Sequence, residues 1–220
     1  MMLNRRDAIA LTGLAFCGKL LAGNSGRFWN SKDPANWTPQ EIDLLLSDSP
    51  WARKPQVWVT GGLPSEHDHR PWSESPPEGV PPGMGIPRKR TRTRWHGVLA
   101  TVRWASAAPI VAATRSALPD SFADHYALAV VGLPLADYSE RQRGDPKGST
   151  LLGAKGRDRV NPDLVEWKLA SQTVLFGFSK RTLPLGKAEH EIVFTANLAS
   201  FEVKATFLLS EMSYRGALAV

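Results

Sequence analysis

Alternating apolar and polar residues run through roughly the last 70 residues of the chain. Four segments carry an apolar side chain at every second position: 165–169, 174–178, 192–198 and 201–209. Because successive side chains of a strand point to opposite faces of the sheet, this period of two predicts strands with one buried face. Only Ala199 and Ser200 separate the last two segments, so we expect a hairpin there and a meander of antiparallel strands overall.

Further strands and one helix are predicted before this meander. Residues 98–104 also alternate, residues 56–60 form a short apolar strand, and residues 126–133 are continuously apolar, as in a strand buried on both faces. Residues 106–118 indicate a helix that ends at Pro119.

A shorter helix is marked by its capping residues. Thr38 can serve as the N-cap of a helix over residues 39–47, Pro39 falls at the first helical position, and Glu41 lies three residues after the cap. This is the pattern of a capping box, in which two side chains satisfy backbone N–H groups at the helix start. Because so short a helix is marginal alone, we expect it to pack on the main domain.

Together these elements predict an α+β fold: a mostly antiparallel β-sheet of about six to eight strands with one or two helices packed on it. The composition divides the chain into four parts. Residues 1–23 are expected to form an export signal; 24–60 hold a tether, the capped helix and the first strand; 61–89 are a Pro/Gly-rich loop; and 90–220 form the β-rich domain. A loop this long inside a compact domain is usually functional or disordered.

The export signal is expected from the order of residues near the N-terminus. Arg5 and Arg6 precede a short apolar stretch that ends at Phe16, and small residues follow it. Charged, apolar and small residues in this order are typical of a secretory signal. The arginine pair resembles the twin-arginine motif, with Ala8 where that motif usually has a large apolar residue. The alternatives are an ordinary secretory signal and an amphipathic N-terminal helix.

Cys17 is the only cysteine, so no disulfide can form within the chain. Residues 14–17 resemble a lipobox, in which the cysteine takes a lipid, although Phe16 stands where a small residue is usual. Lipidation of Cys17 is one interpretation, and removal of this cysteine with the signal is the other. Without disulfides, the exported domain must be held together by its hydrophobic core, and its length is sufficient for one.

Residues 88–94 form a basic run. In a strand, Arg90, Arg92 and Arg94 would share one face, and such a stripe suits phosphates or the anionic headgroups of a membrane surface. The alternative is a solvated edge strand whose charges prevent pairing with other edges. The formal charge of +6 is mild, and no nucleic-acid module surrounds the run, so the sequence favours a protein or envelope component over nucleic acid as partner.

Two further groups of residues are candidates for binding. Residues 66–69 include His67 and His69, whose spacing and imidazoles suit a transition metal. A closed site needs a third and a fourth ligand and the other histidines are scattered, so the sequence favours the alternative of a solvated polar loop. Among the eight tryptophans, Trp29 and Trp72 lie in polar segments and are therefore the better candidates for a surface that stacks on a ligand. The others are expected mainly in the core.

The common catalytic motifs are absent from the sequence: the phosphate-binding loop, the dinucleotide fingerprint, the nucleophile elbow and the zinc-protease helix. The glycine-containing segments 148–150 and 153–156 are typical of turns. We therefore expect no cofactor, and we favour a binding or structural module of the envelope or periplasm. The alternative is an exported enzyme or metal-binding protein that uses the 61–89 loop.

Residues 32–42 (Lys-Asp-Pro-Ala-Asn-Trp-Thr-Pro-Gln-Glu-Ile), followed by Ser-Pro-Trp-Ala at 49–52, resemble a family of uncharacterised exported proteins from Acidobacteria-like bacteria. Residues 102–110 and 129–134 are similar to later blocks of that family. The resemblance extends over about residues 28–220. It implies a bacterial envelope or secreted protein and supplies no activity.

Overall fold

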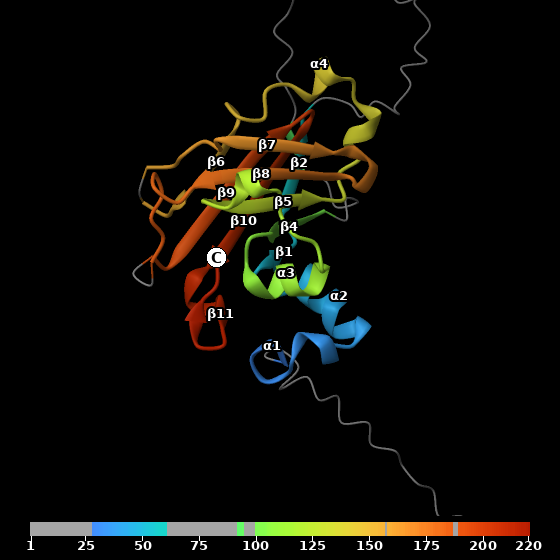
Figure 1. Cartoon of the computed structure of the whole chain (residues 1–220). Helices are drawn as coiled ribbons and strands as arrows, with labels where there is room; N and C mark the ends of the chain where they lie inside the picture. The colour runs from blue at the N-terminus through green and yellow to red at the C-terminus, as the bar shows by residue number, and fades with distance from the viewer. Residues whose placement is uncertain (1–27, 61–91, 95–99, 157, 187–188) are drawn as a thin grey trace, which may run out of the picture.

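Two five-stranded antiparallel sheets form the framework of the described part of the protein (Figure 1). The computed structural model describes residues 28–60, 92–94, 100–156, 158–186 and 189–220. Sheet A has the strand order β1 (Ala52–Arg53), β4 (Thr101–Trp104), β5 (His125–Val131), β8 (Thr173–Ser179), β7 (Leu164–Lys168). Sheet B has the order β3 (Arg92–Arg94), β2 (Gln56–Thr60), β10 (Phe201–Leu208), β9 (Glu191–Leu198), β6 (Thr150–Ala154). A separate hairpin consists of β11 (Ser213–Tyr214) and β12 (Ala217–Leu218).

The predicted α+β class with mostly antiparallel strands is confirmed, but the strands are divided between two sheets where the sequence suggests one. The reason is that alternation reports which side of a strand is buried and not which strand it pairs with. Several partners are distant in the chain, as for β2 with β10 and β5 with β8. The predicted hairpin between β9 and β10 is present, and Ala199 in its turn has a positive φ of 54°.

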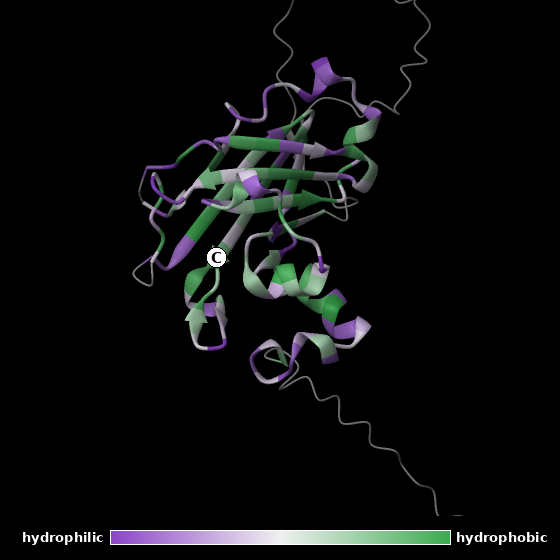
Figure 2. Ribbon diagram, viewed as in Figure 1, coloured by the Kyte–Doolittle hydropathy of each residue, from purple (hydrophilic) through white to green (hydrophobic). Residues whose placement is uncertain are grey.

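The inner faces of the two sheets meet in an aromatic core. Trp104 of sheet A lies edge-on to Phe207 of sheet B, with ring centroids 5.5 Å apart. Phe194 of sheet B contacts Phe176 and Phe178 of sheet A, with centroid distances of 5.6 and 6.4 Å. All five side chains are 0% exposed. These contacts hold the sheets face to face, and apolar residues predominate along β5 and β8 in Figure 2.

Strand β6 corrects one prediction, because Gly153 and Ala154 belong to it and the turn begins only at Lys155. After this turn the chain returns antiparallel, and residue 160 forms a bridge with residue 152. A Cβ at Gly153 would lie 2.9 Å from Cγ of Arg159 and 3.0 Å from its Cα. Glycine therefore allows the returning chain to approach β6 closely.

Short helices fill the connections between strands. The described α-helices are α1 (Phe28–Ser31), α2 (Pro39–Ser47), α3 (Ala108–Thr114) and α4 (Glu140–Arg143). The 3-10 segments are η2 (Pro34–Asn36), η3 (Asp120–Phe122), η4 (Leu135–Asp137), η5 (Leu169–Ser171) and η6 (Leu209–Glu211). Helix α3 is shorter than the predicted 106–118 because Arg115 adopts a left-handed φ of 50° and ends it. None of the helices in these ranges is long and apolar enough to cross a membrane.

Residues 28–36, which the sequence suggests as part of a tether, form α1 and η2 and carry buried aromatic side chains. The prediction that Trp29 lies at the surface is wrong, since its exposed fraction is 5%. Its ring lies edge-on to Trp51, with centroids 5.4 Å apart, and Nε1 of Trp51 donates to the carbonyl of Ala219 at 2.7 Å. These partners are distant in sequence, so the polar neighbours of Trp29 gave no sign of them. Trp72 lies outside the described residues.

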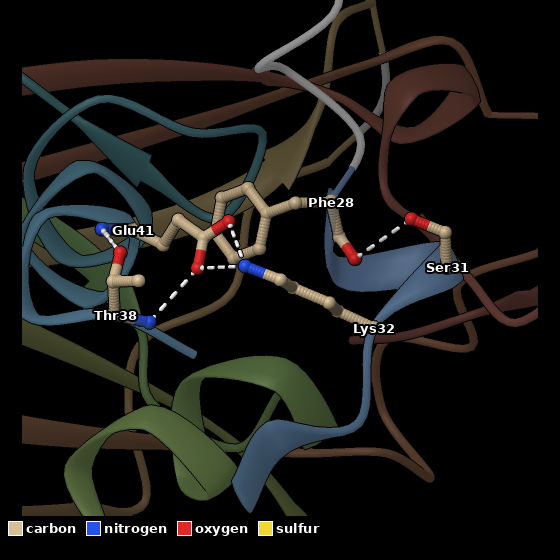
Figure 3. A network of polar contacts seen from close by, with 5 residues as sticks. All are labelled: Phe28, Ser31, Lys32, Thr38 and Glu41. Atoms are coloured by element: carbon tan, nitrogen blue, oxygen red, sulfur yellow. Dashed lines mark hydrogen bonds and ion pairs between the residues drawn. The ribbon is translucent and has the colours of Figure 1, made fainter. Parts of the chain in front are cut away.

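The start of α2 has the predicted capping box (Figure 3). The backbone N–H of Glu41 donates to Oγ1 of Thr38 at 3.2 Å, and the N–H of Thr38 donates to Oε2 of Glu41 at 2.8 Å. Nζ of Lys32 donates to both carboxylate oxygens of Glu41, at 2.7 and 2.8 Å. Hydrogen bonds from Lys32 and from the Thr38 backbone lower the pKa of Glu41. The contact between Lys32 and Glu41 thereby joins the segment after α1 to the start of α2.

Replacing Thr38 with alanine should lower the free energy of unfolding by about 1 kcal/mol, because one N–H at the helix start loses its acceptor. Urea unfolding at neutral pH measures this, and Thr38→Ser, which keeps the hydroxyl, should unfold like the wild type. An unchanged unfolding curve for Thr38→Ala would show that the cap does not hold α2.

Because the pKa of Glu41 is lowered in the folded protein, any stabilisation by its carboxylate is complete above the ordinary glutamate pKa and disappears as the pH falls through the lowered value.

Candidate functional site

The outer face of sheet A, turned away from sheet B, carries short side chains. Ala127 and Ala129 of β5 form a small apolar cluster with Leu175 of β8 and Phe122, separate from the main core. The strand register places Arg103 of β4 beside Ala129, and Ala129 beside Leu175. Because alanine side chains are short, they leave space above the middle of the sheet.

This space is a groove of about 330 Å³. Ala129, Val131 and Leu175 contribute apolar surface from the strands, and further lining comes from α3 and from residues 116–118 after it. Small-molecule sites in proteins have volumes of about 300–1,000 Å³, so the groove is large enough for a small ligand.

Arg103 lines the groove and is held in place by the end of α2. Its Nε donates at 2.6 Å to the carbonyl of Leu46, one of the last helix carbonyls, which lack partners within the helix. Ser49 Oγ satisfies the preceding carbonyl, that of Leu45, at 2.7 Å. Burial lowers the pKa of Arg103, and Asp43 opposes this effect. A guanidinium stays charged in proteins, so Arg103 is a partly desolvated cation fixed before a ligand arrives.

Lys168 is the second cation of the groove and lies on β7, three strands from β4. Its Nζ is 3.5 Å from Oε1 of Glu166, and the two side chains are 41% and 39% exposed. An exposed ion pair of this kind contributes little to stability. Lys168 can therefore exchange Glu166 for an anionic ligand at low cost.

A larger recess of about 410 Å³ is lined by residues from the two segments 154–158 and 182–189. Among the described residues, its charged lining residues are Asp158 and Glu189, and Glu189 already accepts a hydrogen bond from the backbone N–H of Gly186 at 2.8 Å. Within the described ranges, no group of three metal-ligating side chains exists. The described lining of this recess thus has neither a cation for an anionic ligand nor a complete set of metal ligands.

The structure places only two of the site residues predicted from the sequence. Arg92 and Arg94 lie in β3 at the edge of sheet B, where Arg94 pairs with Trp58 and Arg92 with Thr60. Both belong to sheet B, whereas the groove lies on sheet A. The other predicted site residues lie outside the described residues: Cys17, His67, His69 and Arg90.

Sequence reasoning missed Arg103 and Lys168 as candidate ligand contacts. Both occupy polar positions in alternating segments, where a charged residue usually faces solvent. The one available signal was that Arg103 is the single charged residue of the 98–104 segment. No family model, no curated protein and no solved structure matches this chain. A functional proposal therefore rests on the residues of the groove.

Proposed function

We propose that the chain is an exported envelope or periplasmic protein that works as a binding module for a small organic anion with an apolar body. The observation that carries this proposal is the groove on sheet A, in which a fixed, partly desolvated arginine lies beside apolar side chains. Sites for small molecules typically combine an apolar lining with a few fixed polar groups.

The class of ligand follows from the lining. Burial of apolar ligand surface against Ala129, Val131 and Leu175 contributes about 25 cal/mol per Å². Only Nε of Arg103 has a hydrogen-bond partner among the described residues, so its terminal nitrogens can donate to a carboxylate or sulfonate. An anion with an apolar body uses both features, whereas a cation or a sugar uses neither fully.

The support for export comes from the sequence. Arg5 and Arg6, the apolar stretch after them and the small residues that follow have the order of a secretory signal. Residues 32–42 and 49–52 resemble exported proteins of Acidobacteria-like bacteria. A chain whose one cysteine lies in the signal needs no particular redox compartment, so export places no further demand on the domain.

Calorimetric titration of the full chain with decanoate, and with decanol as its uncharged counterpart, tests the binding proposal. We expect saturable decanoate binding that weakens about tenfold in Arg103→Met, which removes the charge and keeps an apolar side chain. Decanol binding should change little in this variant. Val131→Trp should remove binding of both compounds by filling the groove, while Asn197→Trp, on the exposed side of sheet B, should bind like the wild type.

Circular dichroism of each variant separates loss of binding from loss of folding, because Arg103 also supports the end of α2. Absence of saturable decanoate binding by the wild type would contradict the proposal. Equal binding by folded Val131→Trp would place the ligand elsewhere and would also contradict it.

A further inference from the structure

A separate recess lies where the chain crosses from sheet A to sheet B. β1 belongs to sheet A and β2 to sheet B, and only Lys54 and Pro55 connect them. The pairing of β2 with β10 ends at Gln56 and Lys204, whereas β10 continues to Leu208. The recess lies beside the part of β10 that extends past the end of β2, and it has a volume of about 270 Å³.

The described lining of this recess is mainly polar and consists of Arg53, Lys54, Gln56, Lys204, Ala205 and Thr206. Its charged members, Arg53, Lys54 and Lys204, are all cations. Gln56 adds a side-chain amide and Thr206 a hydroxyl, both of which can donate hydrogen bonds. Gln56 and Lys204 are directly opposite in the register, so these two donors come from neighbouring strands.

The charges of the recess are only partly neutralised. Arg53 forms an ion pair with Glu211, but its Nε is buried and has no hydrogen-bond partner among the described residues. In the same ranges, Lys54 and Lys204 have no ion-pair partner. Within the described part of the chain, three cations line the recess and one carboxylate pairs with them, so the recess has a net positive charge.

We propose that this recess binds a phosphate-type oxyanion. A tetrahedral oxyanion carries several acceptor oxygens on one small group, and these match two lysine ammonium groups, the Thr206 hydroxyl and the amide of Gln56. Free phosphate and the phosphodiester of a lipid headgroup share this chemistry. The recess shares no described lining residue with the groove and does not depend on the function proposed for the groove.

Titration of the full chain with inorganic phosphate, followed by the backbone amide NMR signals of Gln56 and Thr206, tests the site. We expect saturable shifts in the wild type, about tenfold weaker binding in Lys54→Gln and in Lys204→Gln, and no measurable binding in the double variant. Lys147→Gln removes an exposed lysine outside the recess and should bind phosphate like the wild type. Raising the salt concentration should weaken binding in the wild type.

Sedimentation with phosphatidylcholine vesicles, with and without phosphatidylglycerol, separates the two sources of the oxyanion. Extra sedimentation with phosphatidylglycerol that disappears in the double lysine variant would assign the site to a lipid headgroup. Phosphate binding without this lysine-dependent sedimentation would assign it to a free phosphate group. If neither probe distinguishes the double variant from Lys147→Gln, the recess is not an oxyanion site and the proposal is overturned.

Discussion

Replacing Phe194 with alanine should lower the free energy of unfolding by about 3–5 kcal/mol, the largest loss of stability that we expect from one substitution in this protein. Phe194 is 0% exposed and lies in β9 of sheet B. Its ring contacts Phe176 and Phe178 of sheet A, so its removal leaves a cavity between the two sheets. The lost contacts belong to the interface that holds the sheets together, and neighbouring strands cannot close the gap without moving the whole sheet.

Chemical unfolding followed by tryptophan fluorescence measures this loss. Phe194→Leu keeps much of the volume and should lose distinctly less stability. Leu208→Ala is the matched control from the neighbouring strand β10, because Leu208 is 38% exposed and its removal should change stability little. A loss below about 1 kcal/mol for Phe194→Ala would mean that the two sheets do not pack through this ring.

Replacing Arg5 and Arg6 together with lysines should keep the full chain in the cytoplasm, with export reduced at least about tenfold. The reason is that a twin-arginine signal depends on the guanidinium pair, which lysine does not reproduce, whereas an ordinary secretory signal needs only positive charge. Cell fractionation of a bacterial host, with immunoblotting for the shortened mature chain, measures export. Lys19→Arg, which changes a basic residue outside the pair, serves as the control.

Either of two results would correct this part of the proposal. Normal export of the double lysine variant would show that an ordinary secretory route is used. Retention of the wild-type chain in the cytoplasm would contradict export itself.

The features predicted from the sequence are those encoded by neighbouring residues. The helix at 39–47 was predicted at its observed bounds because Thr38, Pro39 and Glu41 form its cap within four positions. The β9–β10 hairpin was predicted because its two alternating segments are separated by a two-residue turn. In both cases the decisive interactions lie within a few residues of one another.

The division into two sheets could not be predicted in this way, since it depends on which distant strands pair. The candidate groove is hidden for the same reason. The sequence marks Arg103 as a polar position of a strand, but its bond to the carbonyl of Leu46 and the short side chains beside it come from other parts of the chain. Trp29 shows the opposite error. Its polar neighbours in the sequence suggested an exposed side chain, but its ring packs against Trp51 and is buried.

The pairing of β2 with β10 has a consequence for synthesis on the ribosome. Val59 of β2 pairs with Phe201 of β10, so β2 is made long before this partner, whereas its other neighbour, β3, follows much sooner. At roughly 5–20 residues per second, β2 waits on the order of ten seconds. Sheet B is therefore completed only after β10 has been made, and until then the edge of β2 that pairs with β10 is open and can be shielded by a chaperone.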